Sequence, residues 1–427
     1  MLDVFRALKR AALVIALAAC SSKPAPTAQP VGSASGPGSS SGSGDASAAT
    51  PSYYRVEASI DELHRVPFIV AIEPNKPEGW IWSIDEKLPL VVESRAPLAV
   101  RIPVRGIELR FDSSAPDALG SMKGTWGATY YFKRDFALLA RSIDSPSAAA
   151  LFPGTDAPSG DLTGTLRFDI KDFGVGRGTF RQEADGSLAG TIIPPEVGDL
   201  RHLTGRVTGS TLRASAFDGI HGFLVQGMFD KDTLTGTWSV AGIGTFGFTA
   251  TRDAAPPTHL NVKARMRPGT KRLAIPALDK PPFAGNPVIV DYFGSWCPVC
   301  MDLTPELVRL RREHAADGLQ VLSISLEPDG DERETAKRLD EFRAAFGITW
   351  PFVIKYGDDF AAGLPPELVD ATGFPVTIFL RRDHAVAAVH TGFVSTASPT
   401  EHAEVVTLFD QLTADITRGS AAPDPHP

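Results

Sequence analysis

Hydrophobic and polar residues alternate in many short runs between Tyr53 and about Asp253. Turn pairs such as Asp185-Gly186 and Asp218-Gly219 separate these runs, and no long helical period appears. Alternation with a period of two is typical of strands that are buried on one side. We expect strands at Val66–Glu73, Leu88–Glu93, Leu98–Pro103, Ile107–Asp112, Gly164–Ile170, Gly178–Gln182 and Thr211–Phe217. The pattern therefore predicts an all-β domain over residues 53–253, folded as a sandwich or a barrel.

A short motif recurs in this region. It consists of an apolar residue, any residue, Gly, Thr and a second apolar residue, in that order. Its glycines lie at positions 124, 164, 190 and 236, with a variant at 205. The uneven gaps argue against a regular solenoid or propeller and favour glycines at close strand crossings. We expect His221, in the run Phe217–Phe223, to be a structural histidine of a hairpin turn. We therefore assign no catalytic group to this domain.

The pattern changes after Ala254–Arg272, a polar stretch that we interpret as an interdomain linker. Continuous apolar runs are expected to be buried strands, and runs with apolar residues three and four apart are expected to be helices. Ser398-Pro-Thr-Glu401 has the form of a capping box that opens a last helix, to about Ile416. The expected order is strand Pro287–Phe293, helix Pro298–Glu313, strand Leu319–Leu326, helix Glu332–Phe346, and strands Pro351–Ile354, Val376–Leu380 and Ala385–Val389. This order predicts an α/β domain over residues 273–418 and a disordered tail over 419–427.

The N-terminus has the features of a targeting segment. Arg6, Lys9 and Arg10 precede the apolar run Ala11–Ala19, which is too short to span a bilayer. The run ends at Cys20, and Leu17-Ala-Ala-Cys20 resembles the lipobox of bacterial lipoproteins. This resemblance implies a signal peptide over residues 1–19 and a lipid on Cys20; the alternative is a plain secretory signal.

The segment that follows Cys20 is expected to be a spacer. Residues 20–52 are rich in Ser, Gly, Pro, Ala and Thr, which favours a flexible, disordered linker. The lipid would then be the chain's only contact with a membrane, on the periplasmic side of the cell envelope. Ser21 gives no retention signal of the Asp type, which favours the outer membrane.

Composition narrows the possible functions. The formal net charge is −8, so we expect no nucleic-acid partner. The three cysteines, Cys20, Cys297 and Cys300, cannot form a disulfide framework. Zinc commonly takes four ligands, and no second cysteine pair or suitably spaced histidines accompany Cys297 and Cys300. We therefore expect neither a metal nor another cofactor.

The spacing of Cys297 and Cys300 suits thiol–disulfide chemistry. The helix predicted from Pro298 places Cys297 at its N-terminus, where unpaired amides and the helix dipole favour a thiolate. Cys300 lies one turn further along and could resolve a mixed disulfide formed by Cys297. Asp291 lies in the apolar strand before the pair, so burial would raise its pKa and let it accept a proton from Cys300.

The run Val290-Asp-Tyr-Phe-Gly-Ser-Trp-Cys-Pro-Val-Cys300 resembles the active-site segment of the thioredoxin superfamily. Gly373-Phe-Pro-Val376 resembles the cis-proline loop of that superfamily. The resemblance implies catalytic roles for Cys297, Cys300 and Asp291. It also implies a substrate groove formed by Trp296, Pro298, Phe374 and Pro375, with a cis peptide bond before Pro375. Pro305 lies where the superfamily kinks its first active-site helix.

Residues 273–416 most resemble the TlpA/ResA group, which carries an extra helix and strand, here Glu332–Ile354. This resemblance implies a membrane-tethered reductase of protein disulfides, with apocytochrome c (in cytochrome c biogenesis) or copper-site cysteines as substrates. It also implies a membrane protein that donates electrons to the pair. Met301 and Leu303 stand where that group often has Arg and Glu, which leaves redox potential and partner choice open.

Two other functions are consistent with the sequence. The first is a thiol peroxidase of the AhpC/TSA type, although Val290 and Gly294 stand where peroxiredoxins have the Pro and Thr of their Pro-x-x-x-Thr-x-x-Cys pattern. The second is a binding or scaffold lipoprotein in which the all-β domain is the main functional part and the redox domain is accessory.

Overall fold

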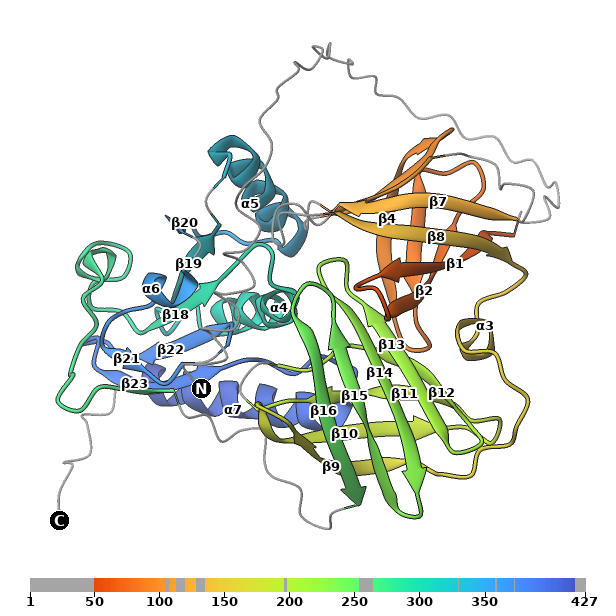
Figure 1. Cartoon of the computed structure of the whole chain (residues 1–427). Coiled ribbons are helices and arrows are strands. Elements are labelled where there is room, and N and C mark those ends of the chain that lie inside the picture. Colours follow the sequence, from red (N-terminus) through yellow and green to blue (C-terminus); the bar gives the residue numbers. More distant parts are fainter. Residues whose placement is uncertain are drawn as a thin grey trace, which may run out of the picture. The chain divides into compact units, whose positions relative to one another are not determined.

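The computed structural model describes residues 50–418, apart from 104–106, 113–119, 128–134, 196–197, 253–263, 329, 358 and 372. The expected signal peptide, the Cys20 expected to carry a lipid, nearly all of the first linker, most of the interdomain linker and the C-terminal tail lie outside the described residues. The described chain contains two closed β-barrels followed by an α/β part (Figure 1). The fold class predicted from the sequence, all-β followed by α/β, is thus confirmed, with barrels as the form of the β part.

Eight antiparallel strands close the first barrel, because β1 pairs with both β2 and β8. Buried and more exposed residues alternate along most of these strands, whereas all residues of β2 after Arg65 are buried. The inward side chains form one apolar core around Trp126. The strands are β1 (Ser52–Ser59), β2 (Arg65–Ile72), β3 (Glu78–Trp82), β4 (Lys87–Arg95), β5 (Leu98–Ile102), β6 (Ile107–Phe111), β7 (Ser121–Gly127) and β8 (Asp135–Ile143).

A short helix, α3 (Ala148–Leu151), leads to a second barrel, in which β9 pairs with both β10 and β16. Two motif glycines show why glycine recurs here. A side chain at Gly190 or Gly236 would lie 2.1 Å from a carbonyl oxygen of the neighbouring strand, so the strands can approach this closely only at glycine. The strands are β9 (Gly164–Ile170), β10 (Gly174–Gln182), β11 (Ser187–Ile193), β12 (Leu203–Thr208), β13 (Thr211–Phe217), β14 (Gly222–Asp230), β15 (Thr233–Val240) and β16 (Gly244–Arg252).

The range 53–253, expected as one domain, therefore contains two barrels, which meet at the β13–β14 hairpin. Phe217 of this hairpin stacks on Phe68 of the first barrel at 4.1 Å between ring centroids, and Trp126 donates its indole N–H to the carbonyl of Gly219. Within the turn, Asp218 accepts the backbone N–H of His221 and contacts the His221 ring at 3.1 Å. His221 is thus a structural turn histidine, as predicted.

A five-stranded sheet with the order β20-β19-β18-β22-β23 forms the centre of the α/β part. Strands β18, β19 and β20 are parallel, and β22 runs antiparallel to β18 and β23. The elements are β17 (Arg265–Met266), η1 (Pro276–Asp279), β18 (Val288–Phe293), α4 (Pro298–Glu313), β19 (Gln320–Glu327), α5 (Glu332–Phe346), β20 (Phe352–Tyr356), α6 (Phe360–Gly363), β21 (Leu368–Val369), β22 (Val376–Leu380), β23 (Val386–Thr391) and α7 (Pro399–Thr417).

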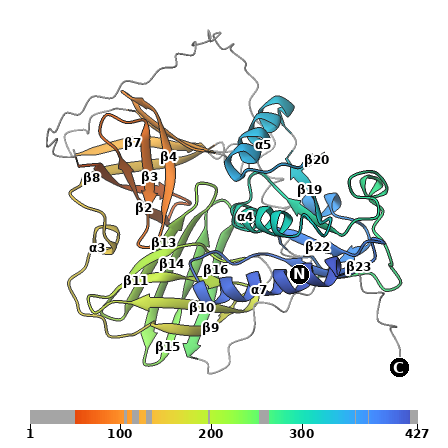
Figure 2. The same ribbon diagram turned by 180° about the vertical axis from the view of Figure 1, so that it is seen from behind.

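The three long helices α4, α5 and α7 pack on one face of this sheet, as the reverse view in Figure 2 helps to follow. Because side chains of a strand alternate between faces, Ile289 and Phe293 of β18 point to the helices, and Val290 points to the opposite face. The helix-covered face also carries Cys297 and Cys300 in its apolar cluster. The redox pair therefore lies against the side of β18 to which Asp291 also points.

The helix ends show one departure from the sequence prediction. Asp331 caps α5 by accepting the backbone N–H of Arg333. Ser398, expected to cap α7, makes no side-chain bond to the helix backbone and donates its hydroxyl to the Glu401 carboxylate instead. Glu401 in turn pairs with Arg177 of the second barrel at 2.8 Å, so the expected capping box is part of a contact between barrel and helix.

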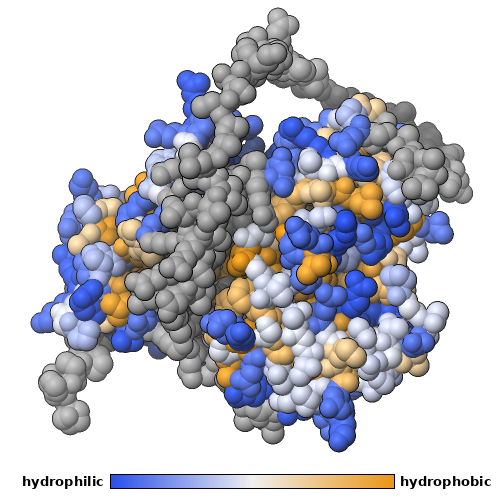
Figure 3. Space-filling model, in the orientation of Figure 1, coloured by the Kyte–Doolittle hydropathy of each residue, from blue (hydrophilic) through white to orange (hydrophobic). Residues whose placement is uncertain are grey.

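On the face shown in Figure 3, hydrophilic and hydrophobic residues are interspersed over the described surface. Among the described residues, the most exposed large hydrophobic side chains are Leu63 and Met228, on different barrels. No helix in the described part of the chain is both long and apolar enough to cross a bilayer.

Candidate functional site

Cys297 occupies the N-cap position of α4, directly after strand β18 and a short turn. Its Sγ accepts the backbone N–H of Cys300 at 3.2 Å, and Pro298 takes the first helical position, where no N–H is needed. Cys297 and Cys300 form a disulfide with a Cα–Cα distance of 5.2 Å. The free amides and the dipole at this helix end stabilise negative charge on Cys297 whenever the disulfide is opened.

Asp291 lies in the middle of β18, between Ser323 of β19 and Thr377 of β22. The residue is 3 % exposed, and its Oδ1 has no hydrogen-bond partner. Burial raises the pKa of Asp291 to about 7, against the lowering effect of a hydrogen bond with Ser323. The structure thus places the carboxyl inside the sheet on the face of the cysteines; its role as proton acceptor stays a prediction.

The residues expected to form a substrate groove lie together. The Phe374–Pro375 peptide is cis, and the ring of Phe374 contacts that of Trp296 edge-on at 6.0 Å. Trp296 is held by its indole N–H, which donates to the carbonyl of Leu326 at 2.9 Å. Trp296, Pro298 and Pro375 are buried, so only Phe374 of the four expected groove residues is partly exposed.

A buried acid beside the active-site turn was missed in the sequence analysis. Glu327, at the end of β19, is fully buried and accepts the backbone N–H and the hydroxyl of Ser295, each at 2.9 Å. Ser325 donates to the same carboxylate, and the Arg338 guanidinium lies 3.7 Å from it. These bonds fix the turn that carries Trp296 and Cys297. The available signal was an acid at the end of a strand that carries no other charged residue.

No group of three or more potential metal ligands among His, Cys, Asp and Glu occurs within the described residues. The site therefore offers thiol, carboxyl and hydroxyl groups for its chemistry. With two thiols one turn apart and a buried acid on the same side of the sheet, the arrangement can exchange disulfides with an external thiol or disulfide.

Two curated proteins resemble part of the chain. The thiol-disulfide oxidoreductase ResA of Halalkalibacterium halodurans is 23% identical over 125 residues, which are 29% of this chain and 63% of that protein. The ResA of Geobacillus thermodenitrificans is 23% identical over 126 residues, 29% of this chain and 65% of that protein. The matches thus span less than two thirds of either relative. No family profile matches the chain.

Solved structures give matches of similar extent. A secreted thiol-disulfide isomerase from Corynebacterium glutamicum is 23% identical, with a TM-score of 0.25, and covers 44% of this chain and 98% of its own. A putative thiol:disulfide interchange protein DsbE from Chlorobium tepidum is 21% identical, with a TM-score of 0.23, and covers 30% of this chain and 82% of its own.

Proposed function

We propose that the chain is a thiol–disulfide oxidoreductase that reduces protein disulfides, with Cys297 as nucleophile and Cys300 as resolving thiol. The observation that carries the proposal is the disulfide at the N-terminus of α4, on the face of the sheet that also buries Asp291. The relatives named ResA support the same chemistry for the part of the chain that they match.

The electrons and protons of the reaction are accounted for by the site together with two external partners, a substrate disulfide and a reducing dithiol. The Cys297 thiolate attacks one sulfur of a substrate disulfide, forms a mixed disulfide and releases the other substrate sulfur as a thiolate. The Asp291 carboxylate accepts the proton of Cys300, whose thiolate attacks Cys297 Sγ and releases the second substrate sulfur as a thiolate, which then takes up a proton from Asp291 or from water. The substrate gains two electrons, and an external dithiol must reduce the Cys297–Cys300 disulfide again.

We further propose that the protein acts outside the cytoplasm, tethered to a membrane by a lipid on Cys20, and receives electrons from a membrane thiol-reducing protein. The lipobox-like sequence before Cys20 supports the tether, and a dithiol in an oxidising compartment needs such a donor. Mass spectrometry of the mature N-terminus tests the tether. An unmodified Cys20, or cleavage elsewhere, contradicts it.

The decisive experiment combines a redox titration with a turnover assay. We expect a midpoint potential for the Cys297/Cys300 couple near that of thioredoxin, about −270 mV, together with reduction of insulin by the dithiol form. A potential near about −120 mV, typical of strong oxidants, contradicts a reductase. Consumption of hydrogen peroxide as fast as insulin reduction would instead favour the thiol peroxidase.

A further inference from the structure

The redox pair is covered by a segment of the second barrel. Trp296, Cys297 and Cys300 are 5 %, 5 % and 2 % exposed, although nucleophilic exchange needs access to Cys297 Sγ. Ile193, at the end of β11, packs in the same apolar cluster as these three residues. The barrel therefore contributes a side chain to the apolar cluster in which the disulfide is buried.

The turn Gly198–His202, which follows β11 and leads into β12, lies against the redox pair. Gly198 has a φ of +84°, and a side chain there would lie 2.8 and 2.9 Å from the methyl groups of Val299. Val299 is one of the two residues between Cys297 and Cys300. The same side chain would lie 3.1 Å from the carbonyl oxygen of Phe393, so this close approach requires glycine.

Polar contacts hold the turn on the α/β part. Asp199 is buried and accepts the hydroxyl of Ser395 at 2.6 Å and its backbone N–H at 3.3 Å. His202 Nε2 lies 3.4 Å from the hydroxyl of Thr396. Ser395 and Thr396 follow β23, so the turn bridges the loop after β23 and the start of α4.

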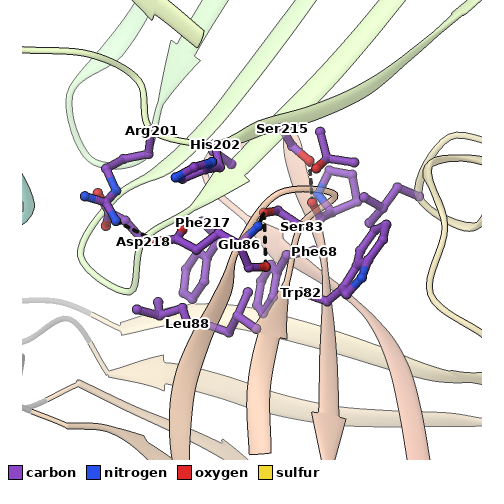
Figure 4. A pocket seen from close by; sticks show the side chains of 15 residues that line it. Phe68, Trp82, Ser83, Glu86, Leu88, Arg201, His202, Ser215, Phe217 and Asp218 are labelled. Carbon is purple, nitrogen blue, oxygen red and sulfur yellow. Dashed lines mark hydrogen bonds and ion pairs between the residues drawn. The ribbon is translucent and has the colours of Figure 1, made fainter. Parts of the chain in front are cut away.

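Arg201 connects the turn to two other parts of the chain. Its guanidinium pairs with Asp302, two residues after Cys300 in α4, and with Glu86 of the first barrel at 2.8 Å. Figure 4 shows Arg201 and Glu86 at the cavity between the barrels, whose volume of about 20 Å³ has room for one water. Arg201 has a φ of +60°, which is a strained backbone conformation for a residue other than glycine. Such a conformation persists only where contacts of the surrounding structure hold it in place.

We propose that the turn Gly198–His202 is a specificity-determining cover of the Cys297–Cys300 disulfide. In the closed arrangement a small dithiol reaches the disulfide through local motion, whereas a protein dithiol must displace the turn. The proposal rests on the proposed oxidoreductase function and adds to it the selection of the reductant. Electron donation is thus restricted to proteins that can move the turn.

The test measures single-turnover reduction of the oxidised full chain, by dithiothreitol as small dithiol and by reduced thioredoxin as protein dithiol. Gly198→Ala pushes the turn off Val299, and Asp302→Asn weakens its attachment from the side of α4. We expect each variant to raise the rate with thioredoxin by about tenfold, because the open fraction limits that rate, and the rate with dithiothreitol by much less. Thiol trapping with peptide mapping confines the readout to Cys297 and Cys300.

Gly186→Ala is the matched control. Gly186 has the same φ of +84° in the same barrel, and a side chain there would lie 2.1 Å from the carbonyl oxygen of Val207. This variant strains the barrel without touching the cover, so its ratio of the two rates should equal that of the wild type. An equal increase in Gly186→Ala, or wild-type ratios in both cover variants, overturns the proposal.

Failure of the proposed function gives a different result. If neither the wild type nor any variant reduces insulin, but Gly198→Ala and Asp302→Asn still react faster with thioredoxin, the proposed cover is supported and the proposed reductase function is contradicted. Asp302→Asn keeps the test valid if Gly198→Ala does not fold, because it changes no backbone conformation.

Discussion

Replacing Asp291 with asparagine removes a buried ionisable group and keeps the size of the side chain. Burial raises the pKa of Asp291 from 3.8 to about 7 in the folded chain. Each unit of difference between the folded and unfolded pKa corresponds to about 1.36 kcal/mol. Once Asp291 is ionised in the folded chain, its burial therefore lowers the free energy of unfolding by on the order of 4 kcal/mol.

The sign follows from proton binding. Between pH 4 and 7, roughly, the folded chain holds a proton on Asp291 that the unfolded chain has released, so stability falls as the pH rises through this window. Above the folded pKa the group is charged in both states, and the full penalty applies. Asparagine carries no such penalty, so the variant should match the wild type near pH 4 and exceed it near pH 8.

The assay is thermal unfolding of the oxidised protein by calorimetry at pH 4.5, 6 and 8, followed in the transition of the α/β part. Asp383→Asn, at an exposed turn after β22, is the matched control and should leave the pH dependence unchanged. A stability gain for Asp291→Asn that is the same at all three pH values would refute the reasoning, because the gain would then not come from ionisation. If Asp291 is the proton acceptor, the same variant should also resolve mixed disulfides more slowly at pH 8.

Three other predictions test the site and the fold. Cys300→Ser should accumulate mixed disulfides with substrate proteins on non-reducing gels, whereas Cys297→Ser should accumulate none. Glu327→Gln should lower the free energy of unfolding by about 2–4 kcal/mol in denaturant titrations, because it disturbs a fully buried acceptor and leaves the Arg338 guanidinium less compensated. An unchanged unfolding midpoint would show that the hydrogen bonds of Glu327 do not contribute to stability. Phe217→Ala should cost about 3–5 kcal/mol, because it empties the contact between the barrels, whereas Met228→Ala, at a side chain that is 59 % exposed, should cost less than about 0.5 kcal/mol.

Local signals in the sequence were sufficient for helices α4 and α5 of the α/β part. The helices Pro298–Glu313 and Glu332–Phe346 have the predicted bounds, because capping residues and apolar spacing act within a few residues of each other. The redox pair was equally accessible to prediction, because two cysteines one turn apart leave few other chemical uses.

Contacts between distant residues were not predictable in this way. The division of residues 53–253 into two barrels depends on β1 pairing with β8 and β9 pairing with β16, and alternation within a strand does not specify its partner. The hydrogen bond that Ser395 donates to Asp199 joins residues 196 positions apart, and nothing in the sequence around Asp199 marks it as a neighbour of the loop after β23. Glu327 was overlooked because its partner, Ser295, lies in a different element.

The ion pairs of Arg201 argue against the hypothesis that the β part is an independent binding module. The Arg201 side chain is 7 % exposed, and its charge is balanced by Glu86 of the first barrel and Asp302 of α4. Removing either partner leaves the buried charge of Arg201 only partly compensated, which destabilises the fold. A β part separated from the α/β part would lose Asp302 and expose Ile193. Cutting the chain between the two parts would therefore perturb the second barrel as well as the surroundings of the redox pair. Point substitutions in the full chain therefore separate the two roles, and the contacts that attach the second barrel are the same contacts that close access to Cys297.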